Sequence, residues 1–380
     1  MGNDGRHKVG LVLTGGGARA AYQVGVLRAI AELVPDNVRN PFPIICGTSA
    51  GAVNAAVLAA NGSDFRRGVR MLMTVWKNFR AYHVYRADPV GVFQNTVQWL
   101  TAVIAGGGLG RKTAVSVLDN SPLGELLRTR LDFSTIQTAI DAGDLIAVSI
   151  TCSGYSSGQS VSFYQGVPGL EPWNRARRVG IPMPIAPDHL LASSALPFIF
   201  PAVHINREYF GDGSMRQIAP VSPALHLGAD RLLIIGVGRQ LKSQPERTKA
   251  EGYPSLAQIA GHCLNSIFLD SLEVDLERLQ RINRTLSMMP PEIAARNAVS
   301  MRPVDFRLVA PSEELERIAM TFRHELPGAI RFLLYGALRR RGSNLLSYLL
   351  FEKSYCRALI QLGYKDTMER KDELVAFLGY

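Results

Sequence analysis

One segment constrains the possible fold of this chain more than any other. It is an apolar run, followed by a turn of small residues and then by an alanine-rich stretch. The run covers residues 42–46, and the turn reads G-T-S-A-G at residues 47–51. This order predicts a buried strand, a tight turn and a helix, which is the setting of a G-x-S-x-G nucleophile elbow. A serine there projects from the backbone, and glycines beside it let the turn bend and a substrate approach. We therefore treat Ser49 as a candidate nucleophile, flanked by Gly47 and Gly51.

The same order of strand, glycine turn and helix stands earlier in the chain. Residues 9–13 are rich in valine and leucine, Gly15, Gly16 and Gly17 follow, and apolar residues then recur every three to four positions. Residues 8–61 are thus expected to form two βα units of an α/β fold. The backbone N–H groups of a glycine loop at the start of a helix can hold an anion.

Two anions suit this loop. One is the pyrophosphate of a dinucleotide, because Gly15, Gly17 and Ala20 satisfy the G-x-G-x-x-A pattern. The other is the transient oxyanion of acyl transfer. If the two strands are parallel neighbours about 4.8 Å apart, both loops open at the same edge of the sheet. The oxyanion is favoured, because a pyrophosphate needs no serine turn and no acidic residue follows the second strand before Asp64.

A serine hydroxyl needs a proton acceptor, and Asp212 is the best candidate. It follows an aromatic, strand-like pair and stands between two glycines, a pattern that also suits a simple hairpin turn. The preceding segment, A-S-S-A-L-P-F-I-F-P at residues 192–201, is small and then apolar with two prolines. That composition is typical of a packed turn at the wall of a site.

Histidine is the usual alternative base. The chain has seven histidines, none of them in a local motif. A triad using His226, His262 or His324 stays open as a second mechanism for the same ester chemistry.

Four segments in this order make the chain resemble the patatin-like phospholipases, a family of lipid acyl hydrolases. They are L-T-G-G-G-A-R-A at 13–20, G-T-S-A-G at 47–51, A-S-S-A-L-P-F-I-F-P at 192–201 and D-G-S at 212–214. The resemblance implies a three-layer α/β/α core with a mainly parallel sheet, followed by a C-terminal helical region. It also implies cleavage of carboxylic esters of membrane lipids, of the phospholipase A or lysophospholipase type, without a metal or cofactor.

The resemblance further implies a Ser–Asp dyad, with Ser49 as nucleophile and Asp212 as base. The implied oxyanion hole consists of the backbone amides of Gly15, Gly16 and Gly17, with Arg19 closing the motif. Two departures concern the loops and not the reacting groups. Many relatives have glycine where this chain has Ala20, and glycine or alanine where it has Ser214.

The amino-acid composition limits the classes of molecule that this protein is expected to bind. The 42 basic and 32 acidic residues give a net charge of +10, which favours anionic partners. Because no nucleic-acid motif is present, we expect a lipid substrate at a membrane or micelle surface and no nucleic acid. Cys46, Cys152, Cys263 and Cys356 are far apart and lie in strand or helix patterns, so we expect reduced, buried thiols. With no signal peptide or membrane span evident, we expect a cytoplasmic protein that contacts membranes peripherally.

We expect a hydrolase domain over residues 1–310 and a C-terminal helical extension over 311–380 that packs on it. Further expected strands cover residues 145–151, 160–164, 231–238 and 306–309, and expected helices cover 256–286, 313–323, 329–340, 344–362 and 369–378. The glycines of residues 106–113 imitate a P-loop, but Arg111 stands where that motif requires glycine. A catalytically silent lipid- or nucleotide-binding protein on the same scaffold stays open as an alternative from another functional class.

Overall fold

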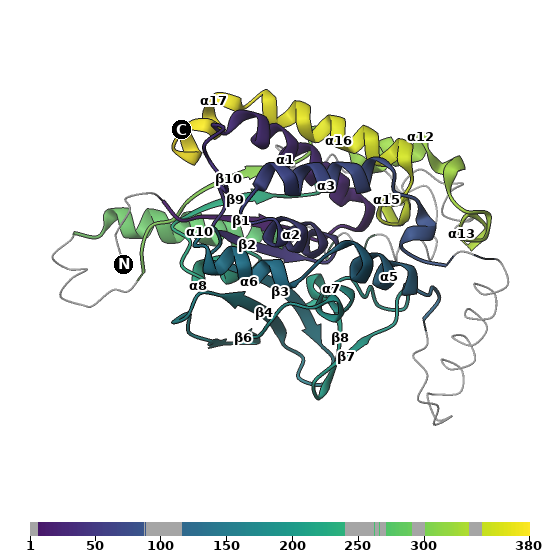
Figure 1. The fold of residues 1–380 in the computed structure, drawn as a ribbon, viewed down its shortest axis with the longest axis horizontal. Helices are drawn as coiled ribbons and strands as arrows, with labels where there is room; N and C mark the ends of the chain where they lie inside the picture. The colour runs from purple at the N-terminus through teal and green to yellow at the C-terminus, as the bar shows by residue number, and fades with distance from the viewer. Residues whose placement is uncertain are drawn as a thin grey trace, which may run out of the picture.

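One large, mostly parallel β-sheet organises the chain (Figure 1). The computed structural model describes residues 7–86, 116–239, 271–290, 301–333 and 344–380, and the single residues 88, 262 and 266. The strands are β1 (Val9–Leu13), β2 (Ile44–Thr48), β3 (Ala147–Gly154), β4 (Ser160–Gly166), β5 (Trp173–Arg175), β6 (Arg178–Pro182), β7 (Val203–Ile205), β8 (Glu208–Asp212), β9 (Arg231–Ile235) and β10 (Asp305–Val309). Their order along the sheet is β10-β9-β1-β2-β3-β4-β6-β5, and β8 pairs with both β3 and β7.

The first five strands in this order, from β10 to β3, run parallel to one another. β3 then pairs antiparallel with β4 along one stretch and with β8 beyond it. The two predicted βα units are therefore neighbours, and the predicted strands at 145–151 and 160–164 correspond to the paired strands β3 and β4. Because parallel strands end at one edge of a sheet, the turns that follow β1 and β2 lie side by side.

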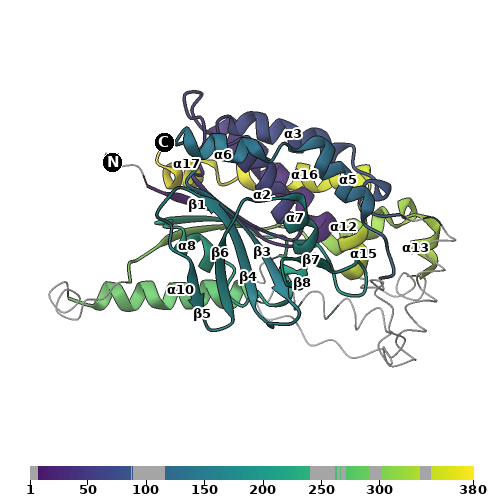
Figure 2. The same cartoon turned by 60° about the horizontal axis from the view of Figure 1, so that its bottom comes forward.

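The main helices are α1 (Ala21–Leu33), α2 (Ala50–Ala60), α3 (Phe65–Lys77), α5 (Ser121–Arg130), α6 (Ser134–Asp141), α7 (Pro187–Ser193), α8 (Ser222–His226), α10 (Ser271–Met288), α12 (Leu315–Thr321), α13 (Gly328–Leu333), α15 (Asn344–Leu349), α16 (Lys353–Met368) and α17 (Lys371–Leu378). α1 and α2 cover one face of the sheet, with α3 and α16 packed on α1, whereas α8 and α10 cover the other face (Figure 2).

Alternation along β1 shows why both faces are covered. Leu11 and Leu13 belong to the apolar cluster that includes α1 and α2, while Val12 belongs to the cluster that includes α8 and α10. Successive side chains of a strand point to opposite faces, so an all-apolar strand needs helices on both sides. The expected three-layer α/β/α architecture, with a mainly parallel sheet and helices at the C-terminal end, is confirmed.

The C-terminal segment differs in one respect from the expectation. The helix predicted over residues 344–362 is two helices, because the chain leaves helical geometry between the end of α15 and the start of α16. There Phe351 lines an internal pocket, and the buried Glu352 accepts a hydrogen bond from the backbone N–H of Ala81 (3.3 Å). Apolar periodicity continues across this break, so the sequence pattern did not reveal it.

Buried residues of α15 and α16 belong to the same apolar cluster as α1. We therefore propose to describe residues 311–380 as an extension that shares the core of residues 1–310. Cys46, Cys152 and Cys356 are free and buried, as expected. Several segments of interest in the sequence lie outside the described residues. They are Cys263, residues 92–105 and 106–113, Arg339 to Arg341 and the start of the helix expected over 256–286. Within the described part of the chain, no helix combines the length and apolar character that a membrane crossing requires.

Candidate active site

The turns after β1 and β2 touch each other. Leu13 and Gly47 are paired in the register of the two strands. A β-carbon added at Gly51 would come within 2.4 Å of the carbonyl oxygen of Leu13, and one added at Gly47 would come within 2.5 Å of the carbonyl oxygen of Gly51. Only glycine therefore lets the serine turn fold back on itself and pack against the glycine loop.

Ser49 occupies the bend between β2 and α2. Its backbone is in a region that non-glycine residues rarely adopt, with φ of 55° and ψ of −130°. It stands at the N-cap of α2, and its side chain is almost wholly buried. Strain of this kind costs about 1–3 kcal/mol and persists only where the surrounding structure enforces it. The predicted strand–turn–helix setting of Ser49 is thus observed.

Asp212 reaches Ser49 from two strands away. It is the last residue of β8 and lies opposite Cys152 of β3, which is itself the neighbour of β2. The hydroxyl of Ser49 donates to Oδ2 of Asp212 at 2.6 Å. The other carboxylate oxygen, Oδ1, accepts a hydrogen bond from the backbone N–H of Ser214 at 2.9 Å. Both oxygens are therefore oriented, and one of them faces the serine.

Burial controls the ionisation of this carboxyl group. Asp212 is fully buried, and the loss of solvent raises the pKa of its carboxyl to about 6, against the opposing effect of the hydrogen bonds from Ser49 and Ser214. A carboxylate with a pKa this close to neutral is a better proton acceptor than an exposed aspartate, yet it is still ionised at pH 7.

The segment 192–201 forms a wall beside the pair. The hydroxyl of Ser193 accepts the backbone N–H of Ser49 (2.9 Å) and donates to the carbonyl oxygen of Thr151 (2.6 Å). The carbonyl oxygen of Ala195 accepts the backbone N–H of Asp212 (2.9 Å). One short segment thus fixes the backbone at both residues. The sequence indicated a wall here, but it did not single out Ser193.

The glycine loop lies beside Ser49 at the start of α1. Gly17 has a φ of +55° and lines the same pocket as Ser49. Within the described residues, no backbone carbonyl accepts a hydrogen bond from the amides of Gly15, Gly16 or Gly17. These N–H groups stand at the N-terminal end of a helix, where negative charge is stabilised.

Arg19 has other partners. Its backbone N–H donates to the carbonyl oxygen of Gly16 (3.1 Å), and its side chain is buried. The guanidinium donates to Ser347 (2.8 Å) and to Glu316 (2.7 Å), and it lies 3.9 Å from the ring centre of Tyr348. The backbone N–H and the guanidinium of Arg19 are therefore both engaged by other residues. It holds the glycine loop to the C-terminal helices, a contact that no sequence motif indicated.

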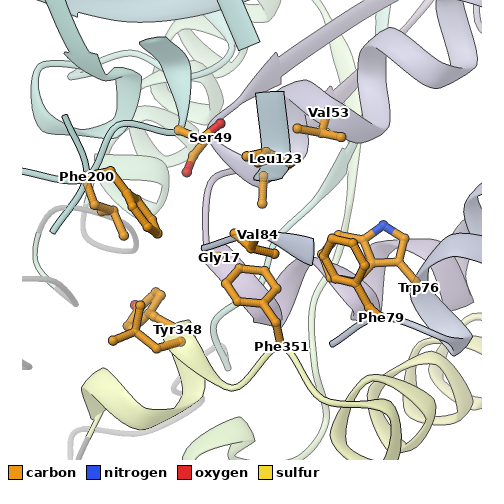
Figure 3. Close-up of a pocket in the computed structure, with 14 residues that line it drawn as sticks. Gly17, Ser49, Val53, Trp76, Phe79, Val84, Leu123, Phe200, Tyr348 and Phe351 are labelled. Atoms are coloured by element: carbon orange, nitrogen blue, oxygen red, sulfur yellow. The ribbon is translucent and has the colours of Figure 1, made fainter. Parts of the chain in front are cut away.

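A narrow apolar pocket leads away from Ser49 (Figure 3). It contains about 510 Å³ of empty space, part of it open to solvent. Trp76 and Phe79 lie together on one side, and Phe351 and Tyr348 come from the C-terminal segment (Figure 3). The Trp76 indole is fixed by a hydrogen bond to Asn54 (2.9 Å). Such a lining suits a hydrocarbon chain and offers little to a charged or polar ligand.

The histidines lie elsewhere. The ring of His226 stacks on Trp173 with centroids 4.8 Å apart, and the side chains of His262 and His324 are exposed. In the described part of the chain, no histidine is hydrogen-bonded to Ser49 or Asp212. The geometry gives no support to the triad alternative.

Comparison with solved structures finds similar chains at low identity. VipD from Legionella pneumophila is 13% identical with a TM-score of 0.38, over 97% of this chain and 67% of that one. Human GIVD cytosolic phospholipase A2 is 12% identical with a TM-score of 0.47, over 100% of this chain and 60% of that one. The same human protein in complex with methyl γ-linolenyl fluorophosphonate is 14% identical with a TM-score of 0.43, again over 100% and 60%. This chain thus spans about three fifths of the length of the human protein.

No curated protein matches the sequence. The sequence model of the family described as patatin-like phospholipase does match, over residues 11–225, which is more than half of the chain. The match includes the glycine loop, the serine turn and the aspartate whose geometry is described above. The chain belongs to the patatin-like phospholipase family.

Proposed function

We propose that this chain is a lipid acyl hydrolase of the phospholipase A or lysophospholipase type, which cleaves carboxylic esters of membrane lipids through an acyl-enzyme on Ser49. The observation that carries the proposal is the 2.6 Å contact between Ser49 Oγ and Asp212 Oδ2 beside an apolar pocket. Nucleophilic catalysis requires a nucleophile and a base within hydrogen-bonding distance of each other, with the base held in place by further contacts.

In the first step, Ser49 Oγ attacks the ester carbonyl carbon while Asp212 accepts the hydroxyl proton. The tetrahedral intermediate then collapses, and the proton passes from Asp212 to the departing alcohol oxygen. This leaves the acyl group on Ser49. General base catalysis of this kind contributes about 10²–10⁴-fold.

The negative oxygen of the intermediate needs preorganised donors. The amides of Gly15, Gly16 and Gly17 supply them, because Gly17 lines the pocket beside Ser49 and none of the three amides has a backbone acceptor among the described residues. One such donor is worth roughly 3–4 kcal/mol of transition-state stabilisation. In the second step, water loses its proton to Asp212 and attacks the acyl-enzyme, which releases the fatty acid and returns the proton to Ser49.

The substrate class follows from the pocket and the family. The apolar lining accepts an acyl chain, and the net charge of +10 favours an anionic lipid surface. We therefore propose a lipid substrate presented at a membrane or micelle surface, with no metal or cofactor taking part.

Product analysis tests the proposal directly. A mixed lipid extract is incubated with the intact protein, with Ser49→Ala or with the control Ser63→Ala, and the products are identified by mass spectrometry. Ser63 is a serine just beyond the C-terminal end of α2. We expect free fatty acids and lysophospholipids with the intact protein and the control, and neither with Ser49→Ala. Equal product from Ser49→Ala refutes the acyl-enzyme.

Two further measurements address the alternatives. A fluorophosphonate probe that labels Ser49 excludes a catalytically silent binding protein. Alanine variants of His226, His262 and His324 that keep full activity exclude a triad esterase.

A further inference from the structure

A second cavity, lined by residues of α3 and α5, shares Phe79 with the pocket beside Ser49. Its apolar walls come from Met71, Val75, Phe79 and Leu126, and His83 and Arg130 are among its polar lining residues. It contains about 890 Å³ of empty space, part of it open to solvent. Phe79 lines both cavities, so its side chain is shared between them. We call this cavity the α3–α5 groove.

Positive charge gathers at the groove. Arg130 is the last residue of α5 and lines it directly. Together with burial, the charges of Arg80, Lys353 and Arg130 lower the pKa of His83, which places all three cations near this ring. Arg80 is paired with Glu352 (3.6 Å), but neither Arg130 nor Lys353 forms an ion pair within the described part of the chain. The groove therefore has an exposed cation, Arg130, beside its apolar walls.

Apolar walls beside cations define the ligand that fits. A hydrocarbon chain gains about 25 cal/mol for each Å² of apolar surface that it removes from water. An anionic head beside Arg130 forms a charge-assisted hydrogen bond. A neutral amphiphile lacks this second contribution, and a zwitterionic head brings its own cation into the field of Arg80, Lys353 and Arg130.

We propose that the α3–α5 groove is a second ligand site, distinct from the pocket beside Ser49, and that it binds a single-chain carboxylate amphiphile, a free fatty acid. Such a ligand matches the apolar walls of the groove and the exposed Arg130 of its lining. The site is independent of the proposed function, because binding requires neither the Ser49 hydroxyl nor turnover.

Calorimetric titration of the Ser49→Ala chain tests the proposal without any catalysis. The titrants are dodecanoate, dodecanol and dodecylphosphocholine, which share one chain and differ in the head, all below their micellar range. We expect saturable dodecanoate binding that Arg130→Ala weakens about tenfold and Arg130→Glu weakens further. Arg128→Ala is the matched control, because Arg128 lies on the same helix, is exposed, and pairs with Asp188 (3.2 Å) outside the groove. It should bind dodecanoate as the parent chain does.

A further variant, Met71→Trp, narrows the groove and should weaken dodecanoate and dodecanol alike. The proposal is overturned by the absence of saturable dodecanoate binding, by Arg130→Glu binding as the parent chain does, or by dodecanol or dodecylphosphocholine binding as tightly as dodecanoate. Since all titrations use a chain without the Ser49 hydroxyl, a failure of ester hydrolysis in the intact protein leaves this result unaffected.

Discussion

The carbonyl oxygen of Tyr348 lies so close to Gly17 that a β-carbon on Gly17 would come within 2.3 Å of it. Tyr348 belongs to α15 and stands outside the residues that the family model matches. The glycine loop is therefore confined by the serine turn on one side and by the C-terminal helices on the other. This contact explains why the pocket beside Ser49 has walls from both ends of the chain.

Gly17→Ala should lower kcat by at least about 100-fold, because it removes both the positive φ and the space that the loop needs. Gly143→Ala is the control, since Gly143 also has a positive φ (+76°) but has no atom within 4 Å of an added β-carbon. Chemical denaturation should show a cost of about 1 kcal/mol for the control and more for Gly17→Ala. Equal costs would mean that the Tyr348 contact is not tight.

Arg19→Ala should destabilise the protein by roughly 3 kcal/mol, because it removes a buried side chain from Ser347 and Tyr348 and leaves the partly buried Glu316 without its partner. The matched variant is Arg28→Ala on α1, whose pair with Glu32 (3.0 Å) is exposed. It should cost less than about 1 kcal/mol. Urea unfolding monitored by circular dichroism distinguishes the two, and similar midpoints would contradict the role assigned to Arg19.

Asp212→Asn should reduce ester hydrolysis by at least about 10²-fold, because an amide cannot accept the proton of Ser49. Thermal unfolding should change little, since the amide oxygen can still accept the Ser214 N–H. Asp188→Asn, an exposed aspartate, should keep full activity. Rates on a chromogenic acyl ester check the prediction, and an active Asp212→Asn protein excludes the dyad.

Ser49→Gly should be more stable than Ser49→Ala by about 1 kcal/mol, because only glycine adopts a φ of 55° without strain in this turn. Both variants lack the hydroxyl, so the comparison isolates the backbone. Differential scanning calorimetry gives the measurement. If the two unfold at the same temperature, the turn does not store the strain that its dihedral angles indicate.

The pH dependence should follow Asp212. Because burial raises the pKa of its carboxyl to about 6, kcat/KM should rise through a midpoint near pH 6 and level off above it as the carboxylate forms. A profile that is flat from pH 5 to pH 8, or one that falls with increasing pH in this range, would contradict the assignment of Asp212 as the base.

The same shift affects stability with a definite sign. The pKa of Asp212 in the folded protein lies above the value of about 3.9 expected in the unfolded chain. Between about pH 4 and pH 6 the folded state therefore binds more protons, so this residue lowers the free energy of unfolding as pH rises through that window. The Asp212→Asn variant should lack this part of the dependence, which denaturation at a series of pH values will show.

Local patterns determined the two βα units. Apolar runs, glycines and helical periodicity act over a few residues, so the pattern of residues 8–61 directly predicted the strands, turns and helices there. The same patterns predicted the paired strands β3 and β4. They failed at residues 350–352, where the contacts of Phe351 and Glu352 with distant residues interrupt a continuous apolar periodicity.

The residues around Asp212 made it a candidate proton acceptor for Ser49, and the resemblance to a family implied a Ser–Asp dyad. Nothing in local spacing shows that the two residues, 163 positions apart, approach each other. The contacts that hold the site together could not be read from any motif. Ser193, Arg19 and Tyr348 take their roles from contacts between segments far apart in the chain. The sequence by itself determined the candidate reacting groups and the turns that carry them, since these depend on residue type and backbone freedom. Tertiary packing alone decided the 2.6 Å approach of serine to aspartate, the raised pKa and the C-terminal wall of the pocket, since distance and burial arise only when the layers assemble.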